Sequence, residues 1–505
     1  MMTLAGMLLL LFAVPVRAAT FSLVEVRPAA IPFLRLTGAQ ELSPSIELWR
    51  VPSRELRQLR HARLVRLTEP ERHLVVPEVQ RTADPLLASE WWLAPVGATN
   101  VVAPGPGVPV AVVDTGVDFS HPEFLQRPDT TSLNAQSVVD TPTDFHGTAV
   151  ASVVGAPAND VGMVGIYPQA ALYSYDIDLS GRLTLGELVQ GIDTAAGRGR
   201  VVINLSLGST ELDPVLQDAV FSAFRRGALV VAAAGNSGPS GPLNYPANFA
   251  HVLTVGATDE SGRPADFSSA SQGVDLAAPG VGITVAVPLL YSPAAYLVLD
   301  GTSFSAPIVS GGAALVWTVR SDLDNTQLFD LMRFSARDIG TRGFDTETGF
   351  GMLDIPKALA DEAPVRDVEE PNDDIRLVKP GGLFAAGTPA LTSPTKGKAF
   401  LRATLDVTDD PADVYRLWVP AGHSATVTAR GAYGLRLRAW EPKTRTIAEA
   451  GAAAKRDLAA SSSSRVSIRN SSKRGGYYYA DVRLAHGIRN GAYDLNVTTS
   501  ATATP

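Results

Sequence analysis

The chain of 505 residues has no cysteine and only 7 histidines, and its first lysine is Lys357. Without cysteine there is no disulfide framework, no thiolate metal site and no cysteine nucleophile. Any extracellular stability must therefore come from core packing or bound ions. The formal net charge of −8 argues against a general nucleic-acid binder, because phosphate binding requires a basic face. The hydrophobic fraction of 45% excludes global disorder.

An apolar run near the N-terminus, from Ala5 to Val14, is too short to span a bilayer, which needs ~20 apolar residues. Val16 and Ala18 place apolar and small residues where a signal peptidase cuts. The sequence therefore predicts a secretory signal peptide cleaved after Ala18 and a secreted, periplasmic or surface-held product. No lysine or arginine precedes the run, so a buried N-terminal helix or a misplaced start codon is the alternative. No membrane span is expected elsewhere.

Residues 20–79 are mixed in character and rich in arginine. Within them, residues 54–66 form an amphipathic pattern with Leu56, Leu59 and Leu64 on one side, which predicts a helix. We expect a small α+β unit here. Residues 81–107 contain Pro, Gly and Ala with little periodicity, and they predict an exposed connector.

From residue 108 to about 359, buried-strand patterns alternate with helical patterns. The strand candidates are residues 108–113, 171–174, 201–207, 228–234 and 252–257, and the helix candidates are residues 185–196 and 214–226. Near-continuous apolar strands suit a parallel sheet that is covered on both faces. The alternation predicts an α/β fold with a mostly parallel sheet covered by helices.

After about residue 361 the composition changes again. The run from Asp367 to Asp374 is acidic and turn-forming, and it predicts a linker over residues 362–374. Beyond it, short alternating segments are separated by turn formers, including Asn490-Gly491. These segments are residues 412–420, 425–429, 435–440, 477–484 and 493–498. They predict a C-terminal all-β sandwich. The serine-rich residues 459–464 are expected to form a solvated loop.

Four polar residues lie at the ends of predicted strands or at the starts of predicted helices. Asp114 ends an apolar strand, at the sheet edge where catalytic groups gather. His146 opens a helical run and is a natural proton carrier near neutral pH. Ser303 begins a helix of small residues, near the positive end of its dipole. Asn236 follows a buried strand, where its amide could donate to an oxyanion. Taken singly, each has a structural alternative, such as a turn residue or an N-cap.

Together these residues occur in the order Asp, His, Asn, Ser. The segments AVVDTGVDFSHPEF, HGTAVASVVG, VVAAAGNSG and GTSFSAPIVSGGAAL carry them. Those segments, with VINLSLGS, VDLAAPG and TGFGMLDIPKAL, resemble the subtilisin-like (subtilase) serine peptidases over roughly residues 84–359. The resemblance implies a division into a signal peptide (1–18), a propeptide-like domain (19–82), a peptidase domain (83–361), a linker (362–374) and a β-sandwich (375–505).

The resemblance also implies roles for these residues. Ser303 would be the nucleophile, His146 its general base, and Asp114 the group that orients the imidazole. Asn236 and the Ser303 N–H would form the oxyanion hole. Extended polypeptide substrates would pair with two strand edges. The expected substrate-binding residues are Ser206, Leu207 and Gly208 on one edge, Gly181 on the other, and Ala233, Ala234, Gly235 and Asn244 in the pocket before the cut. None of them is charged, so we expect uncharged side chains of medium or large size in that pocket.

The family comparison suggests one structural ion. The possible ligands are the carboxylate of Glu123, the side chain of Asn159 and the carbonyls of Pro157, Val161 and Met163. Oxygen ligands of this kind suit Ca2+, although Glu123 replaces the more usual Asp. The alternative is a solvated loop. No cofactor is expected for catalysis. A second departure is Ala149, which stands where many relatives have a second histidine and should affect only packing.

Both flanks carry weaker likenesses. Residues 20–79 resemble a shortened subtilase propeptide, through LVRLTEP and LVVP, which would act as a transient inhibitor of its own chain. The alternative is a permanent N-terminal domain. The C-terminal part resembles the pre-peptidase C-terminal β-sandwich of secreted bacterial peptidases, through EEPNDD and ADVYRL.

Two functions compete. The first is a secreted serine endopeptidase, and the second is an inactive subtilase fold that acts as a binding or adhesion protein. The complete set of Asp114, His146, Asn236 and Ser303 favours the enzyme, because a binding protein needs none of them. A metal or nucleotide enzyme has no support, because the chain has no His-Glu-x-x-His, no Walker loop and no Gly-x-Gly-x-x-Gly after a strand.

Overall fold

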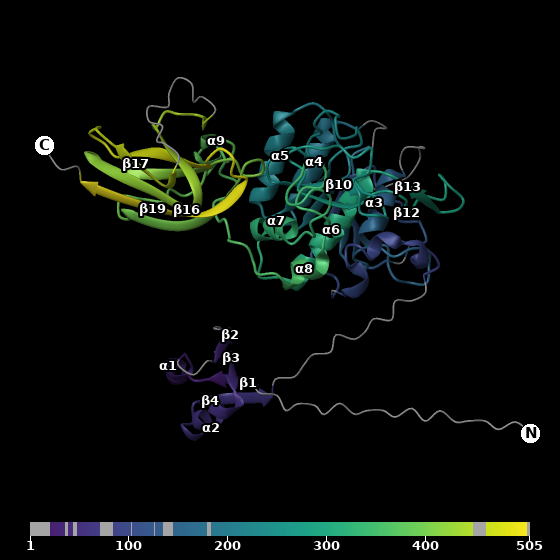
Figure 1. Cartoon of the computed structure of the whole chain (residues 1–505), viewed down its shortest axis with the longest axis horizontal. Helices are drawn as coiled ribbons and strands as arrows, with labels where there is room; N and C mark the ends of the chain where they lie inside the picture. The colour runs from purple at the N-terminus through teal and green to yellow at the C-terminus, as the bar shows by residue number, and fades with distance from the viewer. Residues whose placement is uncertain are drawn as a thin grey trace, which may run out of the picture. The chain divides into compact units, whose positions relative to one another are not determined.

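The computed structural model describes residues 21–35, 39–43, 48–70, 84–102, 104–125, 127–134, 145–178, 183–447 and 461–501. They belong to two compact units divided between Gln80 and Arg81, and each unit is described here by itself. Figure 1 labels the helices and strands. The predicted signal peptide, residues 1–18, lies outside the described residues and stays a prediction.

The smaller unit is an antiparallel sheet with helices, which confirms the expected α+β pattern. The sheet has the order β2-β3-β1-β4, formed by β1 (Phe21–Val26), β2 (Gln40–Ser43), β3 (Leu48–Pro52) and β4 (Val65–Pro70). The helices are α1 (Ile31–Leu34) and α2 (Ser53–His61). Leu59 of α2 packs with Val24 and Trp49 of the sheet. Helix α2 ends before the predicted residue 66 because Arg63 takes a left-handed φ of 58°, which turns the chain into β4.

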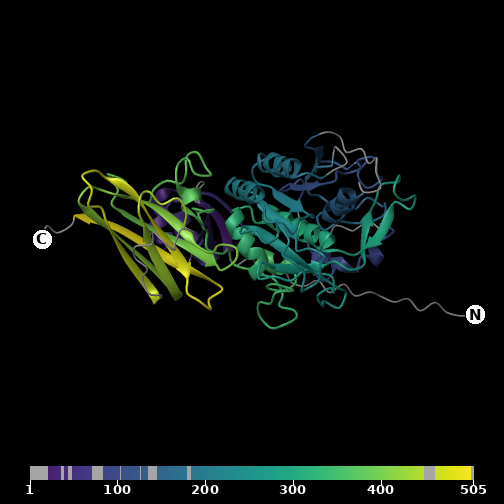
Figure 2. The same ribbon diagram turned by 90° about the horizontal axis from the view of Figure 1, so that it is seen from above.

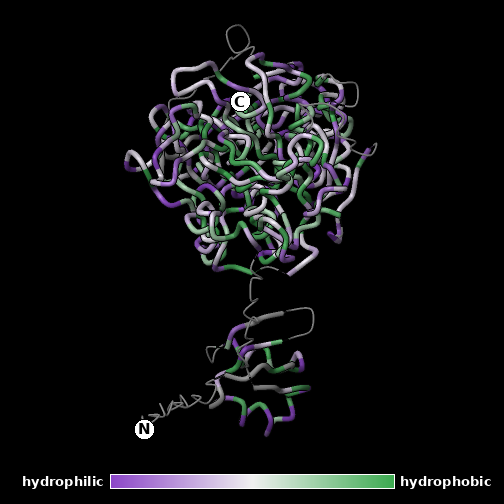
Figure 3. The backbone as a smooth tube through the Cα atoms, turned by 90° about the vertical axis from the view of Figure 1, so that its right-hand side faces the viewer, coloured by the Kyte–Doolittle hydropathy of each residue, from purple (hydrophilic) through white to green (hydrophobic). Residues whose placement is uncertain are grey.

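The larger unit is built on a seven-stranded sheet with the order β11-β10-β9-β8-β5-β7-β6, in which every pairing is parallel. The strands are β5 (Val110–Asp114), β6 (Thr130–Ser132), β7 (Leu172–Asp176), β8 (Val202–Leu205), β9 (Leu229–Ala233), β10 (Val252–Thr258) and β11 (Leu276–Pro279). The five predicted strands are all present. Figure 3 shows hydrophobic stretches through the middle of this unit and hydrophilic stretches on many peripheral loops.

Helices cover both faces of the sheet, as the sequence predicts (Figure 2). On one face, α3 (His146–Gly155) and α6 (Thr302–Val319) pack with Val110 and Val112 of β5. On the other face, α4 (Leu185–Ala196) and α5 (Pro214–Arg225) pack with Ala111 and Val113. The alternation along β5 thus divides the core into two layers. Helices α7 (Asn325–Phe334) and α8 (Ile355–Ala360) and the hairpin of β12 (Ile283–Ala286) and β13 (Tyr296–Leu299) complete the body.

Helix α6 is apolar and long enough, at 18 residues, to cross a membrane by composition alone. Inside the protein 83% of it is buried, however, and it contacts β8, β9, β10 and β11. It is therefore the central core helix of the larger unit.

The expected exposed connector is wrong for residues 84–98. This segment forms the short 3-10 helices η3 (Leu87–Ser89), η4 (Trp91–Leu93) and η5 (Ala98–Asn100). Trp92 and Val96 are fully buried in the core that α3 and α6 share. The two adjacent tryptophans were the sequence feature that could have predicted this, because tryptophan buries a large apolar area.

The C-terminal part is all-β, as expected, and every strand pairing in it is antiparallel. Its elements are α9 (Ile375–Val378), β14 (Lys398–Asp406), β15 (Asp413–Val419), β16 (His423–Trp440), β17 (Ser461–Arg469), β18 (Gly476–Leu484) and β19 (Asn490–Ala501). One long strand, β16, replaces two expected strands. It pairs with β19 up to Gly431, with β17 up to Arg430 and again at Leu435, and with β18 from Leu435.

Two details of this region differ from the sequence predictions. Ser461–Ser464 are not loop residues but the start of β17, where they pair with β16. Asn490 and Gly491 are not a turn but the start of β19, where they pair with β14. In both cases partner strands supply the backbone hydrogen bonds, and these override a local preference for turns.

Part of the predicted linker, Asp367 and residues 371–373, is buried where the sheet body meets the β-sandwich. Asp367 is 4% exposed and Asn372 is fully buried. Glu370 and Asp373 both contact the imidazole of His251, which precedes β10. The acidic run therefore belongs to an interior junction between the two parts of the larger unit.

Candidate active site

Asp114 and His146 are brought together by the carboxyl end of β5 and the first residue of α3. The Asp114 side chain is 2% exposed, and its Oδ1 lies 2.8 Å from His146 Nδ1. The same oxygen accepts the Thr115 N–H at 2.8 Å. Burial alone would lower the pKa of His146, but the charge of Asp114 and the hydrogen bond to it outweigh burial and raise that pKa above 6.5. The imidazole is thus oriented and made more basic.

Two glycines allow α3 to start so close to the sheet. A Cβ on Gly147 would lie 2.0 Å from the carbonyl oxygen of Gly116, so no larger residue fits. Gly116 itself has a φ of 94°, in the left-handed region that glycine tolerates. The Gly147 N–H also donates to the Thr115 hydroxyl at 3.0 Å. The segment that begins with His146 is therefore in close backbone contact with the segment that begins with Asp114.

Ser303 is the second residue of α6 and is partly exposed. Its hydroxyl donates to the Ser206 carbonyl at 3.2 Å, and the Ser206 hydroxyl donates to the Ser303 carbonyl at 2.8 Å. Phe304, the next residue, has its ring centroid 6.1 Å from that of His146. The start of α6 therefore lies between the end of β8 and the histidine.

A buried polar chain behind Ser303 was missed by the sequence analysis. Asn204 Nδ2 donates to the Ser206 hydroxyl at 3.0 Å, and Ser310 donates to Asn204 Oδ1 at 2.9 Å. Asn204 and Ser310 are fully buried. This chain fixes the end of β8 against α6, and an asparagine inside an otherwise apolar strand was the feature that could have revealed it.

Asn236 stands just beyond β9 with its amide oriented by Thr302. Asn236 Oδ1 accepts the Thr302 N–H at 3.0 Å and the Thr302 hydroxyl at 2.8 Å. The Thr302 hydroxyl also accepts the Gly235 N–H at 3.2 Å. Because the oxygen is held by two donors, the Asn236 NH2 group is the end left to face outward. Thr302 is a positioning residue that the sequence analysis did not identify.

The structure gathers the predicted substrate-binding residues around Asn244. A Cβ on Gly208 would lie 2.3 Å from Asn244 Nδ2, and one on Gly235 would lie 3.2 Å from Asn244 Cβ. Asn244 Nδ2 donates to the carbonyl of Ala233 at 3.3 Å. Ala234 follows Ala233 and is 2% exposed. Ser206 and Leu207 lead into Gly208 after β8, whereas Gly181 lies outside the described residues.

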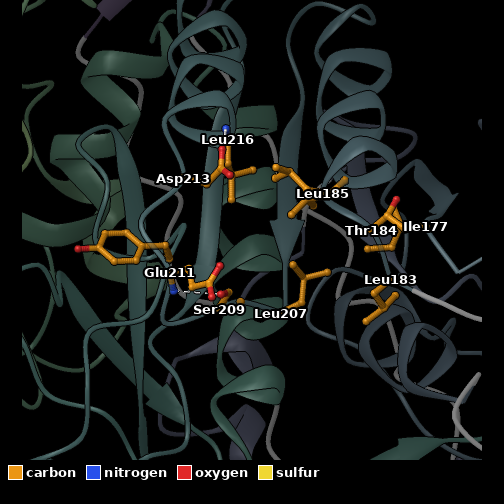
Figure 4. A pocket seen from close by; sticks show the side chains of 12 residues that line it. Ile177, Leu183, Thr184, Leu185, Leu207, Ser209, Glu211, Asp213 and Leu216 are labelled. Atoms are coloured by element: carbon orange, nitrogen blue, oxygen red, sulfur yellow. Dashed lines mark hydrogen bonds between the residues drawn. The ribbon is translucent and has the colours of Figure 1, made fainter.

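An apolar cavity of about 290 Å3 adjoins this edge. Leu207 and Gly208 line it together with residues at the starts of two helices, Leu185 of α4 and Leu216 of α5. Figure 4 shows the leucine side chains facing a common space. Its full lining is Ile177, Leu183, Thr184, Leu185, Leu188, Leu207, Gly208, Ser209, Glu211, Asp213, Leu216 and Tyr245.

The suggested calcium loop is held by carboxylates that accept its N–H groups. Glu123 Oε1 accepts the Met163 N–H and the Tyr296 hydroxyl, each at 2.8 Å. Burial raises the pKa of Glu123 to about 7 against the effect of these two hydrogen bonds. Asp84 Oδ1 accepts the N–H groups of Asn159 and Val161.

The remaining suggested ligands surround the same loop. Asn159 is exposed, and its Oδ1 accepts the Val161 N–H at 3.0 Å. Pro157 is partly buried, and Met163 is fully buried. A calcium ion at this loop stays a prediction.

Comparison with known proteins identifies the family. The model of the subtilase family (peptidase S8) matches residues 105–351. Subtilisin Savinase from Lederbergia lenta is 38% identical over 256 residues, which are 49% of this chain and 93% of that protein. The alkaline protease from Alkalihalobacillus alcalophilus is also 38% identical over 256 residues, 49% of this chain and 66% of that protein.

Among solved structures, the psychrophilic subtilisin-like protease Apa1 from Pseudoalteromonas sp. AS-11 matches 54% of this chain and 97% of that chain, with 20% identity and a TM-score of 0.49. The sequence relatives carry the assignment: the chain belongs to the subtilase family. It is therefore a serine peptidase by family, and polypeptides are its class of substrate.

Proposed function

We propose that this chain is a secreted serine endopeptidase that cleaves peptide bonds through an acyl-enzyme. The observation that carries the proposal is the pairing of Asp114 with His146 at 2.8 Å, beside the helix start that bears Ser303. A buried carboxylate on Nδ1 leaves Nε2 free of the proton, which is the tautomer that a general base requires. A protein that only binds its partners would gain nothing from this arrangement.

In the proposed reaction, Ser303 Oγ attacks the scissile carbonyl carbon while His146 Nε2 takes the hydroxyl proton. For this step the hydroxyl turns from the Ser206 carbonyl toward the imidazole. The Asn236 NH2 and the Ser303 N–H donate to the oxygen that becomes negative. His146 then gives its proton to the leaving amine. Water repeats the sequence on the acyl-enzyme and releases the acid.

Substrate selectivity would follow from two features of the strand edge. The pocket formed by Ala233, Ala234, Gly235 and Asn244 is uncharged, which suits a medium or large uncharged side chain before the cut. The cavity beside Leu207 and Gly208 is lined by leucines, so it suits an apolar side chain farther along the extended peptide.

The flanking regions have proposed roles that follow from the same function. The smaller unit would act as a propeptide that blocks the cleft until it is cut off, and residues 1–18 would direct export. The β-sandwich would be a pre-peptidase C-terminal domain that is retained or removed on maturation. A calcium ion at the Glu123 loop would stabilise the peptidase body.

The decisive experiment compares the chain lacking residues 1–18 with its Ser303→Ala form, with PMSF-treated protein and with Ser305→Ala as a matched control. Ser305 lies in the same helix, but its hydroxyl donates to the buried Pro279 carbonyl. We expect the parent and Ser305→Ala to cleave casein and shorten at the N-terminus, whereas Ser303→Ala and treated protein stay intact and inert.

If a folded parent chain neither shortens, nor cleaves casein, nor reacts with PMSF, the endopeptidase is excluded and the inactive binding protein takes its place. If the parent cleaves casein and shortens only near Asp361, the peptidase stands and the smaller unit is a permanent domain.

A further inference from the structure

The peptidase body and the β-sandwich carry opposite charge. Residues 83–361 contain 29 acids against 12 lysines and arginines, whereas residues 375–505 contain 9 acids against 19 lysines and arginines. The net charge of −8 therefore combines a strongly acidic body with a strongly basic sandwich. A charge asymmetry between two parts of one chain is typical of proteins whose basic part binds an anionic partner.

Four neighbouring segments of the sandwich form one continuous sheet face: residues 398–402 of β14, 494–500 of β19, 424–430 of β16 and 465–469 of β17 (Figure 1). Alternate residues of these segments point into the core, among them Val427, Val466 and Leu495. The residues between them point outward, because successive side chains of a strand lie on opposite sides. Apart from Phe400, every outward residue of the four segments is polar or charged.

The outward residues of this face include five cations and one acid. The acid, Asp494, lies with its Oδ1 3.2 Å from Arg402 Nε, so it accounts for one of the cations. The four others are exposed, and none of them forms an ion pair with a carboxylate of the described residues: Lys398, Arg430, Arg465 and Arg469. The positive charge of the sandwich is therefore concentrated, without a partner, on one face.

The three unpaired arginines follow the direction of the strands. Arg465 and Arg469 are four residues apart on β17, so their Cα atoms are separated by about 14 Å. Arg430 of β16 lies opposite residue 463, one pair of outward residues beyond Arg465. The positive charges thus extend over about 20 Å along the face, which fits a linear anionic chain better than a single small anion.

Hydroxyl and amide groups occupy the space between the cations. Thr426 of β16 lies opposite Ser467 of β17 on one side and opposite Thr498 of β19 on the other. Thr498 in turn lies opposite Lys398, and Asn496 is the next outward residue of β19. Hydroxyl groups both donate and accept hydrogen bonds, and an amide side chain has a donor end and an acceptor end. They therefore match the hydroxyl groups of a sugar.

We propose that this face binds an acidic polysaccharide, a linear chain of sugars that carry carboxylate or sulfate groups. Arg430, Arg465 and Arg469 would pair with the acidic groups, because a guanidinium group donates two parallel hydrogen bonds to an oxyanion. The threonine, serine and asparagine side chains would bind the sugar hydroxyls. Single-stranded nucleic acid suits the face less well, because its bases stack on several aromatic rings and Phe400 is the one outward ring of these segments.

The charge of the peptidase body supports the same division of roles. Its excess of acids repels a polyanion, so the sandwich, and not the body, would hold the polymer. Binding would keep the protein at a surface or matrix that contains acidic sugars. This inference concerns the sandwich alone and does not depend on peptidase activity.

The test uses the Ser303→Ala chain, which prevents self-cleavage, and measures fluorescence anisotropy of end-labelled sugar oligomers. The probes are oligogalacturonate, which carries carboxylates, a sulfated dextran oligomer, and neutral dextran of the same length. We expect at least one acidic oligomer to bind and neutral dextran not to bind. The logarithm of Kd should rise with the logarithm of NaCl concentration with a slope of about 3, because each of the four unpaired cations releases a counterion from the polymer.

Adding Arg465→Gln together with Arg469→Gln should weaken this binding at least ~10-fold and reduce the salt slope by about 1.5, because two charged donors are lost. The matched control is Arg263→Gln together with Arg342→Gln, which removes two exposed arginines from the peptidase body and should leave Kd unchanged. All four side chains are exposed, so both variants should melt at the temperature of the parent.

The sugar hydroxyls are tested by a variant that keeps the charge. Thr426→Val together with Thr498→Val preserves the shape of both side chains and removes their hydroxyls. We expect binding to weaken several-fold with an unchanged salt slope, because hydrogen bonds are lost but no counterion release.

Four results would overturn the proposal. The first is that neither acidic oligomer binds below millimolar concentration. The second is an equal loss of affinity in the arginine variant and in its control, which would mean that net charge and not this face decides binding. The third is tighter binding of single-stranded DNA with the same number of charges. The last is an unchanged Kd in the threonine variant, which would mean ion exchange without recognition of the sugar.

Discussion

The active-site carboxylate and the junction carboxylates are equally buried, but their charges are balanced differently. Asp114 has one imidazole at 2.8 Å and one backbone N–H, so a single acid is matched by a single base. At the junction, Asp367, Glu370, Asp410 and Asp413 lie together, and His251 is the one base among the described residues that contacts them, at Glu370. Arg333 represents an intermediate case, with one cation shared by four acids.

Buried charge has a different consequence at the Asp114–His146 pair and at the acidic junction. A matched pair fixes geometry and pKa, which is what a proton-transfer step needs. A surplus of acid cannot persist unless protons or a cation compensate it. The first region thus matches one acid with one base, whereas in the second the acids of the described residues outnumber the bases. The predictions below test this contrast, from the largest expected effect to the smallest.

Replacing Asp114 with Asn removes the charge while keeping the shape. We expect kcat to fall ~10⁴-fold, because the amide favours the wrong imidazole tautomer. The raised pKa of His146 depends on that charge, so the acidic limb of the kcat/KM profile should move to lower pH. In the parent, activity rises as His146 loses its proton above pH 6.5.

The measurement is a pH–rate profile with a peptide substrate. Asp118→Asn serves as the control, because Asp118 contacts Ser120 and not the imidazole. A profile that keeps its acidic limb in Asp114→Asn would show that Asp114 does not set the pKa of His146.

Replacing Arg333 with Met leaves its four acids without a cation. We expect the free energy of unfolding to fall by about 3–5 kcal/mol, the usual cost of removing one partner from a buried ion pair. Urea denaturation of the Ser303→Ala form measures it, and Asp409→Asn should partly rescue the variant. A loss below ~1 kcal/mol would mean that the four carboxyl groups around Arg333 are already neutral.

Replacing Asn236 with Ala removes the proposed oxyanion donor. We expect kcat to fall ~10²–10³-fold with little change in KM, the size known for the equivalent change in subtilisin. Because Asn236 Oδ1 accepts the N–H and the hydroxyl of buried Thr302, the free energy of unfolding should also fall, by about 1–3 kcal/mol. A loss confined to KM would contradict the assigned role.

Replacing Thr302 with Val keeps the shape of the side chain but removes the hydroxyl that holds Asn236. We expect kcat to fall by about fivefold, because one oriented hydrogen bond contributes ~1 kcal/mol. Thr302→Ser should restore activity. In the double variant with Asn236→Ala the two losses should not add, since Thr302 acts through Asn236; additive losses would exclude this positioning role.

The local sequence specified many elements closely. Helix α4 spans the predicted residues 185–196, and α5 starts at the predicted Pro214. Both have strong N-caps, Thr184 and Asp213, and apolar residues at helical spacing. The wrong predictions have a common cause, which is contact between distant parts of the chain. The burial of Trp92 and the strand conformation of Ser461–Ser464 depend on residues far away in the chain, and no local sequence pattern contains them.

The amino-acid sequence by itself determined the parallel sheet, the all-β C-terminal part and the positions of Asp114, His146, Asn236 and Ser303, because strand patterning and glycine-bearing turns are local properties. Only the tertiary structure decided that Thr302 orients Asn236, that Asn204 and Ser310 support Ser303, and that the acidic linker lies inside a junction. Hydrogen bonds between side chains and buried ion pairs depend on contacts between residues that are far apart in the sequence. The fold determines those contacts.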